Sequence, residues 1–98
     1  MNIQAMMKQA QKLQKDMMNA KKEIDETVFE NTKSFVTIKA MGNKKIESIK
    51  INIDDISKDD LEMIEDMITV TLNELMDKID AETEKKMGKY TQGMPGLF

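Results

Sequence analysis

Apolar residues recur at alternating spacings of three and four along the first 25 positions, which is the heptad pattern of a helix that buries one stripe. The members of this stripe are Ile3, Met6, Ala10, Leu13, Met17, Ala20 and Ile24. Lys8, Lys15 and Lys22 also recur every seven residues, on the opposite side. We therefore predict a helix over about residues 2–25, capped by Asn2, with an apolar docking face and a cationic face.

The middle of the chain changes to a period of two, which is typical of strands with one buried face. In residues 34–41 and 45–53 aliphatic side chains alternate with other residues, and Gly42-Asn43 between them favours a hairpin turn. A β-branched and aromatic run over about residues 27–31 adds a third strand. These runs predict a small antiparallel three-stranded sheet, with its aliphatic face covered by a helix and its other face wet.

A long helix is predicted over about residues 58–91, with Ser57 as its N-cap. Acids crowd its first turn and lysines its end, as the helix dipole favours. At 1.5 Å per residue this helix reaches about 50 Å, whereas a compact domain of this size spans ~26 Å. Part of the helix must therefore project or pack against another chain.

The first half of this long helix is apolar over too wide an arc for a single contact. One stripe is expected to cover the sheet, while the rest meets a second copy in a two-fold homodimer. The residues predicted for this interface are Met63, Met67, Val70, Leu72 and Leu75. We expect one α+β domain over residues 1–91, built as two layers in the order α-β-β-β-α, and a flexible tail over residues 92–98.

The composition excludes most catalytic chemistry. Among its 98 residues the chain has no Cys and no His, and all fifteen cationic side chains are lysine. The commonest zinc ligands and the usual nucleophiles and bases are thus missing. The acids from Asp54 to Glu62 lack the spacing of an EF-hand loop and are explained by helix capping. We expect no enzyme activity, metal site, cofactor or small-molecule substrate.

The chain also lacks the pattern of a secretory signal at its start and any apolar run near the ~18 residues that cross a bilayer. We expect a cytoplasmic protein without a membrane partner. Association of the first helix with a membrane surface is disfavoured, because its apolar stripe has no aromatic anchor.

Charge is strongly segregated: residues 1–22 carry a net +4, residues 54–84 a net −10 and residues 85–98 a net +3. The cations form two clusters, Lys8, Lys12, Lys15, Lys21 and Lys22 near the start, and Lys85, Lys86 and Lys89 near the end. Each cluster alone fits an ordinary structural interpretation, as the solvated side of an amphipathic helix or as cations at a helix C-terminus. In a dimer the four clusters together favour contacts with DNA phosphates. Without arginine, strong reading of base sequence is not expected.

Four segments carry a family resemblance. They are MMKQAQKLQ at residues 6–14, INID at 51–54, the apolar run at 61–73, and EKKM and TQGM between 84 and 94, followed by PGLF. In this order and spacing the chain resembles the YbaB/EbfC family of bacterial nucleoid-associated proteins over essentially its whole length. The resemblance implies an α-β-β-β-α dimer whose long helices project like the arms of tweezers around duplex DNA. It implicates the first helix and the distal part of the last helix in DNA binding.

In this chain, the positions that match the family's DNA-binding segments hold lysines. The resemblance assigns neutralisation of DNA phosphates to Lys8, Lys12 and Lys15 and to Lys85, Lys86 and Lys89. Lys22 is added from the lysine stripe. We expect binding of double-stranded DNA with low sequence specificity, with bending or bridging of the DNA at high occupancy. We also expect a nucleoid location and an influence on nucleoid organisation and gene expression.

A protein-interaction module is the alternative, because long helices beside hairpins also resemble prefoldin-like chaperones, whose helix tips grip partners. The methionines near the start of the chain would suit such adaptable contacts. They are Met6, Met7, Met17 and Met18.

Overall fold

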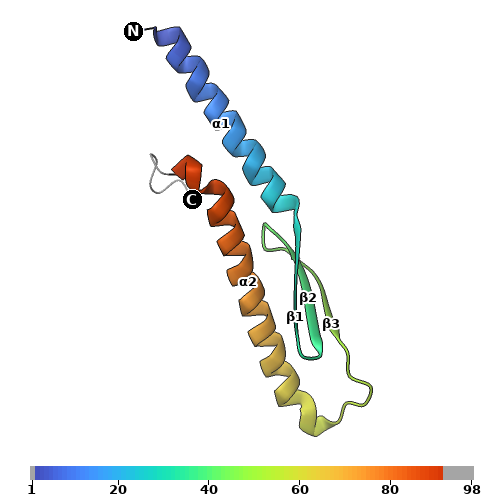
Figure 1. Ribbon diagram of the computed structural model, residues 1–98. Coiled ribbons are helices and arrows are strands. Elements are labelled where there is room, and N and C mark those ends of the chain that lie inside the picture. Colours follow the sequence, from blue (N-terminus) through green and yellow to red (C-terminus); the bar gives the residue numbers. More distant parts are fainter. Residues whose placement is uncertain (1, 92–98) are drawn as a thin grey trace.

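The computed structural model describes residues 2–91, so the expected tail at 92–98 lies outside the described residues. Along the chain come α1 (Ile3–Glu26), β1 (Val28–Lys33), β2 (Val36–Met41), β3 (Ile46–Ile51), a short 3-10 helix η1 (Lys58–Asp60) and α2 (Leu61–Thr91). Two long helices flank a small antiparallel sheet, and the molecule is elongated (Figure 1). This confirms the predicted α+β class and the α-β-β-β-α order.

Local hydrogen bonds define both ends of the first helix. The Asn2 side chain accepts a hydrogen bond from the Ala5 N–H at 3.3 Å and so caps α1. At the other end Thr27 is extended, its N–H donates to the Ile24 carbonyl at 3.0 Å, and its hydroxyl donates to the Glu23 carbonyl at 2.7 Å. The chain therefore leaves α1 directly into β1.

The sheet is a simple meander in the order β1-β2-β3. The register places Phe29 opposite Ala40 and Ile38 opposite Ile49, with an irregularity at Lys39 and Ala40. In the turn between β2 and β3, the left-handed conformation is taken by Lys44, with φ of 73°, and the Asn43 side chain accepts from the Lys45 N–H at 2.9 Å. Gly42 has another role, which is close approach to the end of α1.

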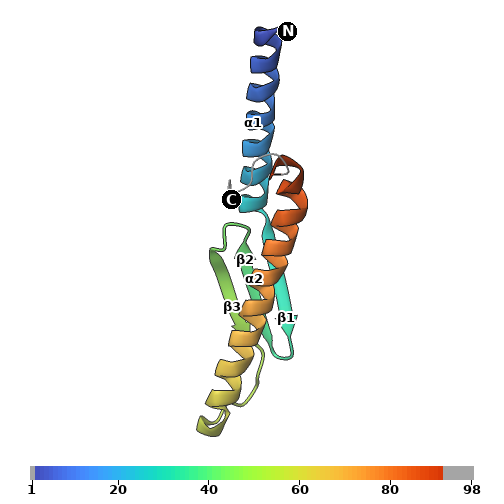
Figure 2. The same ribbon diagram turned by 90° about the vertical axis from the view of Figure 1, so that its left-hand side faces the viewer.

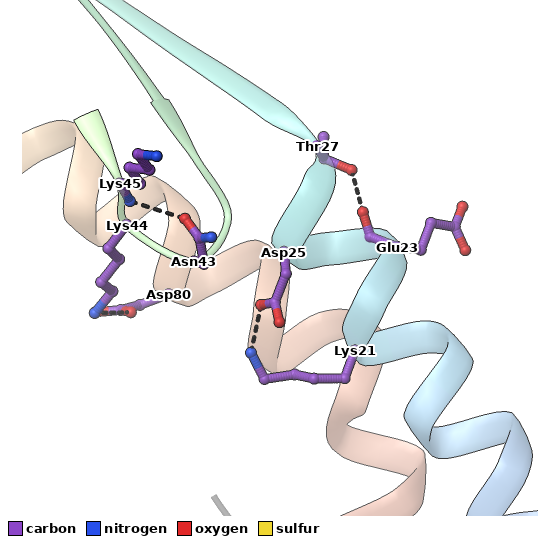
Figure 3. A network of polar contacts seen from close by, with 8 residues as sticks. All are labelled: Lys21, Glu23, Asp25, Thr27, Asn43, Lys44, Lys45 and Asp80. Atoms are coloured by element: carbon purple, nitrogen blue, oxygen red, sulfur yellow. Dashed lines mark hydrogen bonds and ion pairs between the residues drawn. The ribbon is translucent and has the colours of Figure 1, made fainter. Parts of the chain in front are cut away.

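This turn sits between the two helices, as Figure 3 shows. The Gly42 N–H donates to the Thr27 carbonyl at 2.9 Å. On the other side, the Lys44 ammonium lies 2.7 Å from the Asp80 carboxylate of α2. The turn thereby ties the end of α1 to the middle of α2.

The core lies between β2 and the middle of α2. Val36, Ile38 and Ala40 from the strand and Leu75 and Ile79 from the helix form one buried cluster. Their alternation in β2 and their spacing of four in α2 follow the two periods of the sequence. This packing, rather than helix propensity alone, orients α2 along the sheet.

The position of Leu75 corrects part of the predicted dimer interface. Its side chain is fully buried in the core of its own chain, so it has no surface left for a second copy. Met67 and Leu72 are half-buried beside the same cluster. Only Met63 and Val70, with 48% and 40% of their surface exposed, remain open.

The aliphatic face of the sheet is also covered less completely than its pattern predicts. The register puts Ile49 and Ile51 opposite Ile38 and Val36, on the face that carries the core. However, α2 packs on β1 and β2, and Figure 2 shows β3 lying to one side of it. Ile46, Ile49 and Ile51 consequently keep 42%, 46% and 36% of their surface exposed. We call these three residues the β3 strip.

Candidate nucleic-acid interface

The two cationic segments of the sequence come together where the end of α2 meets the middle of α1. From that point α1 continues alone, well past the end of α2 (Figures 1 and 2). Ile24, near the end of α1, and Met87, near the end of α2, are both buried. An open cleft of about 470 Å³ lies between the two helices. Its lining consists of Asp16, Asn19, Ala20 and Glu23 from α1 and Lys85, Lys86, Lys89 and Tyr90 from α2.

The lysines predicted on α1 are all exposed, but they are not equivalent. Lys8, Lys15 and Lys22 stand on the side of α1 away from its apolar stripe, as their seven-residue spacing requires. Lys12 has a carboxylate neighbour, because its ammonium lies 3.6 Å from Asp16 one helical turn away. An ion pair this exposed contributes little to stability.

Lys21, which belongs to the same cluster in the sequence, differs from these four. It is half-buried and pairs with Asp25 at the base of α1 (Figure 3). Its ammonium is already engaged in an ion pair within α1.

The lysines predicted on α2 all line the cleft and are exposed. Lys89 lies in the last turn, where a cation complements the helix dipole, and its ammonium stands 5.0 Å from the centre of the Tyr90 ring. Lys85 and Lys86 precede it by one turn and face α1 across the cleft. The structure thus places all three lysines at the same cleft as Asp16, about seventy positions away in the chain, and the Asp16 carboxylate pairs with Lys12.

The acids on the α1 wall of the cleft were not identified as part of the site from the sequence. Asp16 lies four residues after Lys12, which is a signal for a helical ion pair. Its proximity to Lys85 and Lys86 depends on the packing of α2 against α1, which no local pattern encodes. Asn19 and Glu23 were missed for the same reason.

The opposite end of the molecule is acidic. The segment between β3 and α2 lies at the far end from the start of α1 (Figure 1), and it contains Asp54, Asp55, Asp59 and Asp60. The structure extends over 72 Å along its long axis. Charge is therefore separated along the molecule, with lysines at one end and acids at the other.

Neither a metal site nor a membrane span marks the described part of the chain. Within residues 2–91, no three His, Cys, Asp or Glu side chains are grouped so that they could hold a metal ion. No helix in this range combines the length and apolarity needed to cross a membrane.

Comparison with known proteins gives a consistent result. The sequence model of the YbaB/EbfC DNA-binding family matches residues 1–94. A nucleoid-associated protein of Ligilactobacillus salivarius is 42% identical over 99% of this chain and 95% of its own length. A nucleoid-associated protein of Lactococcus lactis is 42% identical over 97% and 98%.

A solved structure supports the fold. The crystal structure of an uncharacterized protein from Helicobacter pylori superposes with a TM-score of 0.71, covering 95% of this chain and 99% of that one at 16% identity. At this identity the likeness concerns the fold alone, whereas the family match and the relatives span nearly the whole sequence. The chain belongs to the YbaB/EbfC DNA-binding family.

Proposed function

We propose that this protein is a homodimer that binds double-stranded DNA with low sequence specificity through lysine contacts to phosphates. The observation that carries the proposal is that the exposed lysines of α1 and the cleft lysines of α2 lie towards the same end of an elongated molecule whose other end is acidic (Figure 1). A polyanion is attracted to the first end and repelled from the second. The contacting residues are Lys8, Lys12, Lys15 and Lys22 of α1 and Lys85, Lys86 and Lys89 of α2.

Low specificity follows from the kind of cation. Lysine neutralises phosphates well but lacks the planar fork with which arginine reads guanine in the major groove. Contacts of this kind fix a protein on the duplex without carrying sequence information. Such binding suits a nucleoid-associated protein, which meets many unrelated sequences.

The β3 strip supports the dimer. It is an apolar edge that continues the core face of the sheet, and a second copy is the occupant we propose for it. Leu72 of α2 lies next to this edge. At 100° per residue along the helix, Leu72 falls on the same side of α2 as Asp80. Asp80 in turn pairs with Lys44 in the turn before β3. Met63 and Val70 lie on the other side, nearer to Glu74, which pairs with β1.

Binding of the purified protein to unrelated labelled ~30 bp duplexes, followed by fluorescence anisotropy, tests the function. If six phosphates are neutralised, affinity falls roughly a thousandfold between 50 and 200 mM salt. Similar affinities for duplexes of different sequence are also expected. Absence of binding at 50 mM salt would reject the proposal.

The projecting part of α1 favours a second candidate, which is gripping of a partner protein. Its apolar stripe is uncovered beyond the end of α2, with Ile3, Met6 and Leu13 exposed, and Met7 lies beside them. This candidate predicts that the protein suppresses aggregation of an unfolded client and that Met6→Gln with Met7→Gln abolishes the effect. Full suppression by this double variant would exclude α1 as the gripping surface.

A further inference from the structure

We propose that the Asp16 carboxylate weakens DNA binding by this protein and thereby sets its affinity. This inference rests on the proposed function and concerns the same surface. Asp16 is the one described residue that both pairs with a lysine of α1 and lines the cleft with the lysines of α2. It therefore stands between the two cationic clusters.

The order of residues along α1 places this carboxylate in the path of a phosphate backbone. Lys8, Lys12 and Asp16 follow one another at intervals of four residues, so each is displaced by about 40° and 6 Å from the last. Lys85 and Lys86 lie across the cleft from Asp16. A strand that contacts Lys12 and then the lysines of α2 has to pass this carboxylate.

Glu23 adds a second carboxylate on the same wall, deeper towards the base of α1, and the uncharged Asn19 separates the two acids. Because Glu23 lies further from Lys12 along the helix, its repulsion of a phosphate at Lys12 is weaker. Asp16 is therefore the acid whose removal changes the surface most.

The size of the effect follows from the distances. A phosphate oxygen bound to Lys12 at about 3 Å stands within about 7 Å of Asp16, because the same ammonium lies 3.6 Å from that carboxylate. Repulsion between two unit charges at this distance in water weakens binding about threefold. If the DNA contacts both protomers of a dimer, the effect approaches tenfold at low salt, because salt then screens charges only beyond ~10 Å.

A structural role for Asp16 predicts the opposite result. If its carboxylate held the lysines of α2 in place for DNA, its loss would weaken binding. The described ion pair of Asp16 is with Lys12 on its own helix, so no described ion pair of this carboxylate joins α2 to α1. The packing of α2 against α1 therefore does not depend on this carboxylate.

Asp16→Asn separates these cases, because it removes the charge and keeps nearly the same shape. The matched control is Asp55→Asn, which makes the same charge change in the exposed segment between β3 and η1, at the far end of the molecule. Affinity for a labelled ~30 bp duplex is measured by anisotropy at 50 and 200 mM salt. Circular dichroism and the melting temperature establish that each variant is folded.

We expect Asp16→Asn to bind about three- to tenfold more tightly than wild type at 50 mM salt, with a smaller gain at 200 mM. Asp55→Asn stays within about twofold, because its charge lies beyond the screening distance from the lysines. Unchanged or weaker binding by folded Asp16→Asn, while wild type binds, overturns this inference alone. If neither protein binds, the proposed function fails and this inference with it. Binding by Asp16→Asn alone would support the repulsive effect of Asp16 and would reject the proposed function of the wild-type protein.

Discussion

Gly42 lies directly against the backbone carbonyl group of Ile24. A Cβ at position 42 would stand 2.6 Å from the Ile24 carbonyl carbon and closer still to its oxygen. The turn between β2 and β3 is therefore seated under the end of α1, held by the hydrogen bond from Gly42 to Thr27. This contact fixes the direction in which α1 leaves the sheet.

Gly42→Ala is expected to destabilise the protein by about 2–3 kcal/mol, because backbone atoms must move to admit the methyl group. Urea unfolding followed by circular dichroism measures the change. Gly88→Ala is the control: a Cβ there meets nothing within 4 Å, and alanine is favoured over glycine in a helix by ~1 kcal/mol. If both variants gain stability, the Gly42 backbone does not lie close against the Ile24 carbonyl group.

The pH dependence of stability is predicted from Glu74, whose pKa is lowered by hydrogen bonds from Lys33 and Asn31. The Lys33 ammonium lies 2.7 Å from one carboxylate oxygen and the Asn31 amide 3.3 Å from the other. Since the folded pKa is below the unfolded value near 4.5, the carboxylate stabilises the fold above pH 4.5. This contribution is lost as the pH falls through the folded pKa.

Melting temperatures of wild type and Glu74→Gln across pH 3–7 check this prediction. The wild-type advantage should be constant above about pH 5 and shrink below the unfolded pKa. Added salt should reduce it, because both partners are exposed. A difference that grows on acidification would contradict the sign.

Much of the fold is predictable because it depends on local patterns. The period of the apolar positions locates both helices, and the alternation in β2 identifies Val36, Ile38 and Ala40 as core. The start of η1, the short helix that leads into α2, is encoded similarly: the Ser57 N–H donates to the Asp60 side chain at 3.0 Å, as a Ser three residues before an acid predicts. Strand ends differ from the predicted ones by up to two residues because pairing, not propensity, decides them.

The remaining features depend on how far one element covers another. The alternation that identifies the β2 core also places Ile49 on the apolar face, yet α2 is too narrow to cover β3 as well. Likewise, because α2 is apolar over a wide arc, its pattern does not predict that Leu75 faces the sheet and Val70 faces outward. In the cleft, the distance between Asp16 and the lysines of α2 results from tertiary packing alone.

The β3 strip predicts which substitution separates the proposed dimer. Ile49→Asp should shift the protein to monomers, since burying an unpaired carboxylate in the interface is costly. Lys50→Asp, on the same strand but the other face of the sheet, is the control and should leave the dimer intact. Sedimentation analysis of both variants, with Val70→Asp for comparison, decides the matter. Dissociation by Val70→Asp but not by Ile49→Asp would move the interface to the outer side of α2.

The lysines of α1 and the lysines of α2 are both predicted to contribute to DNA affinity. Lys8→Glu with Lys15→Glu on α1, and Lys85→Glu with Lys86→Glu on α2, should each weaken binding at least tenfold at 50 mM salt. Each pair should also lower the slope of affinity against salt by about one per lost phosphate contact. Lys58→Glu, in η1 at the opposite end of the molecule, makes the same substitution away from this surface; it is the control and should leave the slope unchanged. Loss confined to one pair would mean that a single helix carries the DNA, because a duplex held between the arms needs phosphates neutralised on both sides.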